Sequence, residues 1–160
     1  MDLGLSGTAA LVTGASGGIG SAVARELAAE GARVALHYHR NREAAETLAD
    51  ELGGVALAAD LRDEAEADAL VPAAVEALGR LDACVANAGV WPSEDVPVAQ
   101  LGLDRWRATI DANLTATFLT ARAFCRHVEA TGAGAIASAI SAASSSSAAI
   151  PRCRWCTRPR

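Results

Sequence analysis

A cluster of glycines directly after a short apolar run constrains the fold of this chain more than any other feature. Residues 8–13 are almost wholly apolar, as in a parallel strand that is covered on both faces. Glycine permits a positive φ in a tight turn and lets backbone N–H groups approach a phosphate at the start of a helix. The stretch therefore predicts a strand, a phosphate-binding turn and a helix N-terminus. The glycines are Gly14, Gly17, Gly18 and Gly20.

Strand and helix signals alternate along the rest of the chain. Ile19, Val23 and Leu27 recur every four residues in the first helix, and Gly31 predicts its end. Such alternation specifies right-handed βαβ units. We therefore predict an α/β fold, a Rossmann-type doubly wound parallel sheet with strand order 3-2-1-4-5. The further strands are expected at residues 33–38, 55–59, 81–86 and 135–140, and the further helices at 42–52, 64–78 and 104–130.

The last of these helices is the longest. Its apolar residues fall on one stripe at helical spacing, which predicts a long helix with one apolar face. In the preceding helix Asp63 is the expected cap, and Pro72 predicts a kink or a later start because proline has no backbone N–H. The stripe consists of Trp106, Ile110, Leu114, Phe118, Ala121, Cys125 and Val128.

The spacing within the glycine segment has a specific resemblance. The pattern Thr13-Gly14-x-x-x-Gly18-Ile19-Gly20, between a strand and a helix, resembles the cofactor loop of short-chain dehydrogenases/reductases. The resemblance implies a Rossmann domain that binds a dinucleotide. It also implies that the loop contacts the cofactor through Gly14, Ser16, Gly18, Ile19 and Gly20.

The residues after the second strand bear on the choice between NAD and NADP. An NAD-selective Rossmann site places an acidic residue there, on the ribose diol. This chain has Tyr38-His39-Arg40-Asn41 instead. No carboxylate repels a 2′-phosphate, and the guanidinium of Arg40 can bind one through two hydrogen bonds. We therefore predict that NADP(H) is the cofactor and that His39 and Arg40 bind it. The alternative is a solvated basic turn.

Two further strand ends match the family. Asp60 and Leu61 follow the third strand, where the family's acid contacts the adenine and an apolar neighbour packs beside it. Taken alone, Asp60 is better explained as a helix cap or loop acid. After the fourth strand, Ala86-Asn87-Ala88-Gly89 resembles the family's Asn-Asn-Ala-Gly, with Ala in place of the first Asn. Small residues let the backbone approach the cofactor there. The resemblance thus adds Asn87, Ala88 and Gly89 to the cofactor site.

The resemblance implies two catalytic residues, Asn113 and Ser141. Asn113 matches the helix asparagine that holds a water in the family's proton relay, and Ser141 matches the serine that orients the carbonyl. Without the resemblance, Asn113 is a structural residue of a helix. The family's tyrosine and lysine would fall near Arg154 and Arg158. The chain has no lysine, and Tyr38 is its only tyrosine, so we expect this chain to be inactive or nearly so.

The activity implied by the resemblance is that of an oxidoreductase. It would interconvert a ketone and a secondary alcohol by hydride transfer with NADP(H), as 3-oxoacyl-carrier-protein reductases and related ketoreductases do. The implied substrate is a small carbonyl compound or an acyl thioester, and the family is homo-oligomeric. The alternative is a non-catalytic protein, either a dinucleotide-binding remnant or a partner subunit for a complete homologue.

The resemblance covers about residues 5–143. We therefore predict an incomplete NADP-binding domain over residues 1–143, without the family's strands six and seven, and an irregular tail over residues 144–160. Without the elements that follow in the family, the fifth strand would be an exposed sheet edge. Phe118 and Phe124 would likewise form an exposed apolar patch.

Three interpretations of the tail are open. Cys153-x-x-Cys156 would be half of a zinc site or a redox pair, but no second pair and no nearby histidine accompanies it. An arginine-rich tail could instead bind polyanions. We favour the third interpretation, a frameshift, because the codons of residues 150–160 permit a Tyr-x-x-x-Lys segment in another frame. Truncation is the next alternative.

Composition and charge exclude several classes of partner. The net charge of −5 argues against binding to nucleic acid. The chain has no run of about 18 apolar residues and no basic-then-apolar signal at its start, so we expect no membrane partner and a cytoplasmic location. Cys84 and Cys125 fall in expected core elements, where a thiol acts as a small apolar side chain. We expect no metal site.

Overall fold

Five parallel strands form the centre of the protein, in the order β3-β2-β1-β4-β5. This is the predicted order, and it places β1 beside β4, where the direction of winding reverses. The computed structural model describes residues 4–132 and 135–138. The strands are β1 (Ala9–Val12), β2 (Arg33–Tyr38), β3 (Val55–Ala58), β4 (Ala83–Ala86) and β5 (Ala135–Ser138).

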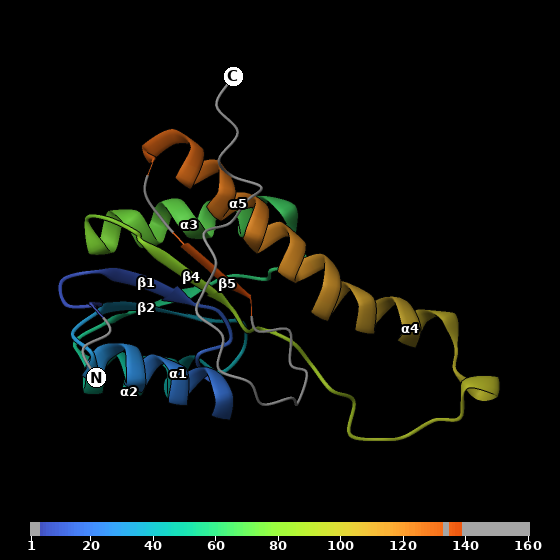
Figure 1. Cartoon of the computed structure of the whole chain (residues 1–160). Helices are drawn as coiled ribbons and strands as arrows, with labels where there is room; N and C mark the ends of the chain where they lie inside the picture. The colour runs from blue at the N-terminus through green and yellow to red at the C-terminus, as the bar shows by residue number, and fades with distance from the viewer. Residues whose placement is uncertain (1–3, 133–134, 139–160) are drawn as a thin grey trace.

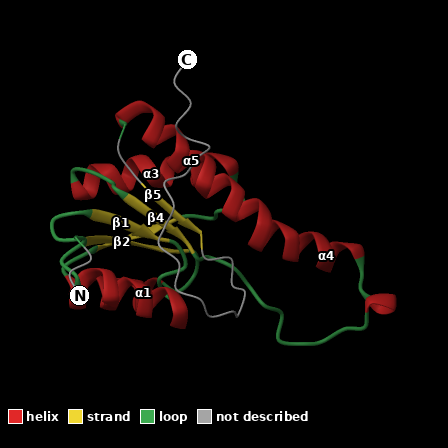
Figure 2. Cartoon of the chain, viewed as in Figure 1, coloured by secondary structure: helices red, strands yellow, loops and turns green. Residues whose placement is uncertain are grey.

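Helices cover both faces of this sheet (Figure 1). α1 and α2 lie against one face, and α3 and α5 lie against the other. Figure 2 shows the strands between these two layers, with α4 and the segment before it extending away from the sheet. The helices are α1 (Gly18–Ala29), α2 (Arg42–Leu52), α3 (Glu64–Leu78), the short η1 (Val98–Gln100), α4 (Leu103–Ile110), η2 (Asp111–Thr115) and α5 (Ala116–Thr131).

The sheet divides the apolar core into two clusters. Val34 and Leu36 of β2 pack with α1 and α2, whereas Ala35 between them packs with α3 and α5. All three are fully buried, because successive side chains of a strand point to opposite faces and both faces are covered. A strand in this position needs apolar residues throughout, which explains the unbroken apolar run at residues 8–13.

Local sequence sets the ends of the helices. Asn41 caps α2, and the carboxylate of Asp63 accepts the N–H groups of Ala65 and Glu66 at 2.9 and 3.0 Å to cap α3. α3 continues through Pro72, which removes one backbone hydrogen bond without ending the helix. Glycines in the left-handed conformation follow α2, α3 and α5, namely Gly53, Gly79 and Gly132.

The prediction of a long helix over residues 104–130 is confirmed, because residues 103–131 are helical throughout, but its apolar stripe is not buried along its whole length. The structure has α4, then the π-helical turn η2, then α5. A π turn has i→i+5 hydrogen bonds, so it rotates the residues after it relative to those before it. The apolar residues on the two sides therefore do not share one face. Trp106, Leu114 and Phe118 are mostly exposed, whereas α5 buries Ala116, Leu119, Thr120, Ala123 and Phe124.

The two phenylalanines of α5 have opposite environments. Phe118 is 57% exposed, as expected, but Phe124 is fully buried in the cluster with α3, so the expected patch does not include it. Ser141 and the expected tail at residues 144–160 lie outside the described residues. Within the described part of the chain, no helix is both long and apolar enough to cross a membrane.

Candidate functional site

Side-chain hydrogen bonds join the carboxyl ends of β1 and β4. The hydroxyl oxygen of Thr13 accepts the N–H groups of Asn87 and Ala88, each at 2.9 Å. The amide nitrogen of Asn87 donates to the carbonyl oxygen of Thr13, also at 2.9 Å. These bonds hold the turn after β1 against the loop after β4, where the winding of the sheet reverses. Ligands of open α/β sheets bind in this crevice.

Two positions require glycine, one in the turn after β1 and one in the first turn of α1. Gly14 has a φ of +66°, and a Cβ there would lie 2.9 Å from the Cα of Ala88. A Cβ on Gly20 would collide with the carbonyl oxygen of Gly14. The absence of these side chains lets α1 begin close to β1 and lets the turn lie against the loop after β4.

The N-terminus of α1 is suited to an anion. Its N-cap residue, Gly17, makes no side-chain hydrogen bond, and the first turn contains no acidic residue. A Cβ on Gly18 would meet no atom within 4 Å, so space is open beside this turn. The partial positive charge and backbone N–H groups of a helix start attract phosphates. These features fit the pyrophosphate of a dinucleotide.

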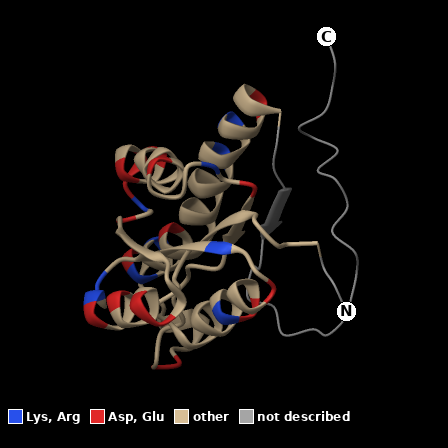
Figure 3. Ribbon diagram, turned by 90° about the vertical axis from the view of Figure 1, so that its left-hand side faces the viewer, with Lys and Arg blue, Asp and Glu red and all other residues tan. Residues whose placement is uncertain are grey.

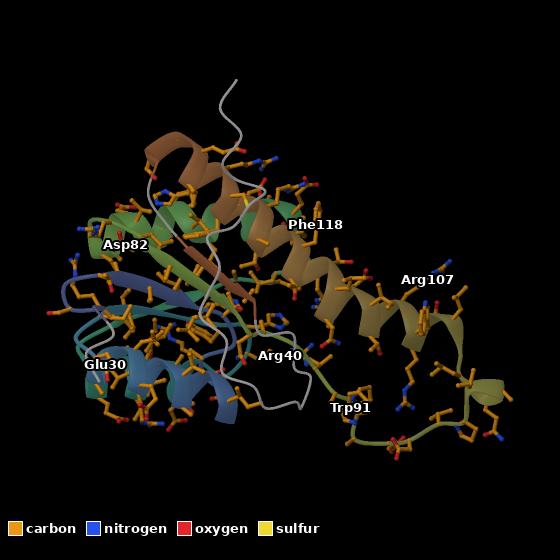
Figure 4. All side chains as sticks on the ribbon, viewed as in Figure 1. Glu30, Arg40, Asp82, Trp91, Arg107 and Phe118 are labelled. Atoms are coloured by element: carbon orange, nitrogen blue, oxygen red, sulfur yellow. The ribbon has the colours of Figure 1, made fainter. Side chains whose placement is uncertain are left out.

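A pocket of about 540 Å³ opens beside this turn. Its size falls within the range of about 300–1,000 Å³ that is typical of small-molecule sites. Figure 4 shows Arg40 at the edge of the sheet and Trp91 on the loop that extends beyond it. Of the predicted site residues, the pocket is lined by Gly14, Ser16, His39, Arg40, Asp60, Leu61, Ala88 and Gly89.

Arg40 and Asp60 differ in their electrostatic partners. Both carboxylate oxygens of Asp60 accept hydrogen bonds from the guanidinium of Arg62, at 2.8 and 2.6 Å. These bonds hold the pKa of Asp60 well below its ordinary value, although partial burial opposes the shift. His39 Nε2 lies 3.6 Å from the same carboxylate. The exposed guanidinium of Arg40 has no hydrogen bond or ion pair within residues 4–132 and 135–138.

The π turn directs Asn113 towards the loop after β4. Its amide oxygen accepts the N–H of Val90 at 3.1 Å, and its amide nitrogen donates to the carbonyl oxygens of Val90 and Thr109 at 3.0 and 2.8 Å. Gly89 permits this contact, because a Cβ there would lie 2.6 Å from Asn113 Oδ1. Asn113 therefore fixes the path of the loop that borders the pocket. π turns are frequent at functional sites.

A family model described as short chain dehydrogenase matches residues 8–151. The chain belongs to the short-chain dehydrogenase family. The D-threitol dehydrogenase of Mycolicibacterium smegmatis is 40% identical over 140 residues, which cover 84% of this chain and 53% of that protein. A 3-oxoacyl-[acyl-carrier-protein] reductase of Synechocystis is 39% identical over 124 residues, covering 74% of this chain and 49% of that protein. The chain thus spans about half the length of the curated relatives it matches.

Solved structures agree with this assignment. A short-chain dehydrogenase of Burkholderia cenocepacia in complex with NADP is 37% identical, with a TM-score of 0.72 over 84% of this chain and 55% of that one. The short-chain dehydrogenase family uses nicotinamide dinucleotides, which confirms the predicted class of cofactor. The described residues include no cluster of three His, Cys, Asp or Glu side chains that could hold a metal ion.

The remaining predicted residues of this short-chain dehydrogenase lie beside the pocket or outside the described residues. Gly18, Ile19 and Gly20 form the first turn of α1. Asn87 and Asn113 support the loop after β4 from its two ends, through Thr13 and Val90 respectively. Ser141, the predicted catalytic serine, lies outside the described residues.

Sequence reasoning missed several side chains that line the pocket, including the titratable or charged residues His37, Arg62 and Arg105. His37 was detectable in principle, because a polar residue in an otherwise apolar strand must find hydrogen-bond partners. Arg62 follows Asp60 by two residues and was not weighed as its partner. Arg105 comes from α4 and bonds to the carbonyl oxygen of Glu94, so only the packing of α4 reveals it.

Proposed function

We propose that this chain is the NADP(H)-binding part of an oxidoreductase that interconverts a ketone and a secondary alcohol. Membership of the short-chain dehydrogenase family supports the oxidoreductase class. The preference for NADP rests on one observation, the exposed guanidinium of Arg40 beside the pocket. Since Arg62 already pairs with Asp60, Arg40 is the guanidinium that remains available for a 2′-phosphate.

Residues around the pocket would bind the parts of the dinucleotide separately. Backbone N–H groups at the start of α1 would hold the pyrophosphate. Asp60 and Leu61 would hold the adenine, and His39 and Arg40 the 2′-phosphate. The small residues of the loop after β4 would let the backbone approach the cofactor. When bound, NADPH supplies a hydride, and a proton completes the reduction of a carbonyl to an alcohol. The proposed pyrophosphate residues are Gly14, Ser16, Gly18, Ile19 and Gly20, and the loop residues are Asn87, Ala88 and Gly89.

Asn113 and Ser141 are the proposed catalytic residues. The chain has no lysine, and Tyr38 lies on β2, where it pairs with Ala58. A phenol with a pKa of about 10 needs a nearby cation to exchange protons at neutral pH. We therefore propose that the 160-residue chain turns over carbonyl compounds slowly at best. The same observation favours the second candidate function, dinucleotide binding without catalysis.

The proposed substrate is a small carbonyl compound or an acyl thioester. The named relatives include a D-threitol dehydrogenase and a 3-oxoacyl-[acyl-carrier-protein] reductase, which differ in the size of their substrates. NADPH oxidation should be measured with ketoacyl thioesters and with simple ketones, and we expect little turnover of either. Turnover comparable to that of an intact reductase, lost on Ser141→Ala, would contradict slow turnover and support catalysis by this chain.

Cofactor binding itself tests the role of Arg40. The Arg40→Ala variant should weaken NADP binding about tenfold or more and leave NAD binding nearly unchanged, because a charge-assisted contact contributes about 1.5–3 kcal/mol. Arg107→Ala is the matched control, since Arg107 lies on α4 outside the pocket and its loss changes the net charge equally (Figure 4). Titration calorimetry with each dinucleotide gives the dissociation constants. Equal losses for NADP and NAD would show that Arg40 has only a structural role.

A further inference from the structure

His37 is a titratable side chain at the floor of the pocket, only 2% exposed. It lies on β2, between β1 and β3, and both of its ring nitrogens have partners. Nδ1 lies 3.1 Å from the backbone nitrogen of Gly14, and Nε2 lies 3.0 Å from the carbonyl oxygen of Ala59. A backbone N–H can only donate and a carbonyl can only accept. The ring is therefore neutral, with its proton on Nε2.

This ring connects three segments that border the pocket. Gly14 belongs to the glycine-rich turn, and Ala59 immediately precedes Asp60 at the end of β3. The backbone of His37 adds a second bond to the turn, because its carbonyl oxygen accepts the N–H of Ala15 at 2.9 Å. His37 thus holds two consecutive residues of the turn that would face the pyrophosphate. The direction of the backbone N–H groups in that turn depends on these bonds.

Burial of the ring keeps it neutral. Burial is the largest influence on the pKa of His37 and lowers it below its ordinary value, while the bond to Ala59 acts in the opposite direction. His39 and Asp60 are the nearest charged groups, and their effects on His37 oppose each other. Residues 8–20, which form β1 and the turn, contain no titratable side chain. The titratable and charged residues that line the pocket with His37 are His39, Arg40, Asp60, Arg62 and Arg105, and Glu66 accepts the backbone N–H of Asp60.

Protonation of His37 would break the contact with the turn. A proton on Nδ1 would point at the N–H of Gly14, so two donors would face each other across 3.1 Å. Gly14 cannot simply move aside, because it already lies against Ala88 on its other side. The turn as a whole would have to shift, and with it the backbone N–H groups at the start of α1.

We propose that neutral His37 is a positioning residue for the dinucleotide, which fixes the glycine-rich turn, and that its protonation releases the turn and weakens cofactor binding. The proposal rests on the proposed function of the pocket in binding NADP(H). It assigns to His37 no contact with the cofactor. It also predicts that protonation of His37 at low pH weakens NADP(H) binding, in addition to any effect of protonating the phosphates of the cofactor.

The first test uses the cofactor-free chain. Nitrogen NMR of the imidazole rings reports which nitrogen carries the proton, and the Gly14 amide signal reports the turn. We expect His37 as the Nε2–H tautomer at pH 8, and we expect the Gly14 signal to shift at the same pH at which the His37 ring titrates. A His37 ring protonated at pH 7, or a Gly14 signal that does not follow its titration, would overturn the proposal.

The second test compares the pH dependence of NADP binding in matched variants. In His37→Asn the side-chain oxygen can still accept from Gly14 but does not titrate. We expect the wild-type dissociation constant to rise by up to tenfold per pH unit once His37 protonates, at a pH below about 6.5. This rise should be smaller in His37→Asn and should persist in the control His127→Asn, which lies outside the pocket. His39→Asn is measured separately, because His39 is a proposed contact of the 2′-phosphate. All chains are measured with the same ligand, so titration of its phosphate near pH 6 cancels in the comparison.

Two outcomes distinguish a failure of the proposed role of His37 from a failure of the proposed NADP-binding function of the pocket. If the wild-type chain binds no NADP at any pH, the proposed function of the pocket fails. If it binds NADP but the acid loss is the same in His37→Asn, or disappears only in His39→Asn, the positioning role of His37 fails. His37→Phe removes both ring bonds and should raise the dissociation constant about tenfold at pH 8. A change in its melting temperature without a change in affinity would assign His37 a purely structural role.

Discussion

At the scale of single residues, the pocket depends on close contacts that restrict which side chains a position can carry. Thr13 shows this for polar atoms, because its one hydroxyl oxygen accepts two backbone N–H groups from the loop after β4 and is almost fully buried. Gly20 shows it for space, since a Cβ there would collide with the carbonyl of Gly14. Gly18, two residues earlier in the same helix, has open space at the equivalent position. The two glycines of one motif therefore differ in this backbone, because a side chain is excluded at Gly20 but not at Gly18.

These two glycines give a matched pair of variants. Gly20→Ala should lower the free energy of unfolding by about 1–3 kcal/mol, the usual cost of forcing an extra methyl group into a packed site. Gly18→Ala should change it by less than about 1 kcal/mol, and in the stabilising direction, because alanine favours the helix over glycine. Urea unfolding followed by circular dichroism measures both values. Equal destabilisation by the two substitutions would contradict the close contact at Gly20.

At the scale of elements, α5 uses its two faces differently. One face packs on the sheet and α3, with Phe124 at its centre. On the other face, the guanidinium of Arg122 lies 5.5 Å from the ring centre of the exposed Phe118. Arg122 also bonds to Asp68 and Glu64 of α3, at 3.2 and 2.8 Å, so it connects the two helices at their surface. Because water still reaches these partly buried ion pairs, they contribute little, and the apolar contacts beneath them determine how firmly α5 is held.

Substitution of the two phenylalanines distinguishes the two faces of α5. Phe124→Ala should lower the free energy of unfolding by about 3–5 kcal/mol, because it removes a fully buried ring from the core. Phe118→Ala should cost less than about 1 kcal/mol, since most of that ring is already in water. Chemical denaturation of the two variants side by side provides the measurement. Similar losses at both positions would indicate that Phe118 is covered in solution.

At the scale of the whole molecule, the Arg, Asp and Glu residues lie mainly on the helices (Figure 3). The residues of β1 and most of those of β2 and β4 are buried, and nearly all of these are apolar. Asp60, Asp82 and His37 each have a pKa below the ordinary value of the group. Arg62 lowers the pKa of Asp60. Burial alone would raise the pKa of Asp82, but its bonds with Arg80 and with the N–H of Ala9 outweigh burial and lower it. Burial lowers the pKa of His37. Each of these groups binds its proton more weakly in the folded chain than in the unfolded chain.

The stability of the protein should therefore fall in acid, in two stages. A depressed pKa contributes stability above the ordinary pKa of the group, and that contribution is lost as pH falls. The first stage should begin below about pH 6.5, where His37 of the unfolded chain takes up a proton, and the second below about pH 4, where the carboxylates do. Urea unfolding at pH 8, 7, 6 and 5 measures the first stage, and His37→Asn should reduce it. A free energy of unfolding that is constant from pH 8 to pH 5 would contradict the buried neutral state of His37.

Sequence pattern alone determined the sheet and the position of the site along the chain. The strand order, the capping residue Asp63 and the glycine-rich turn all follow from local signals. An apolar run marks a strand covered on both faces, and a glycine marks a turn that other residues cannot adopt. The pocket then follows from topology, because the carboxyl ends of parallel strands meet at the reversal of winding. Arg40 was predicted in this way, from its place after β2, whereas Asp60 was added by the resemblance to the family.

Only the tertiary structure decided which of these residues act on one another. It paired Asp60 with Arg62 and left Arg40 available, and it placed His37 between Gly14 and Ala59. It also placed a π turn within the predicted long helix, where Asn113 bonds to Val90, and it left Phe118 exposed. Local periodicity carries no information about such contacts. Except for the pair of Asp60 and Arg62, they join residues more than twenty positions apart in the chain. Their distances are set by how helices and strands pack, and the hydrophobic pattern restricts this packing but does not specify it.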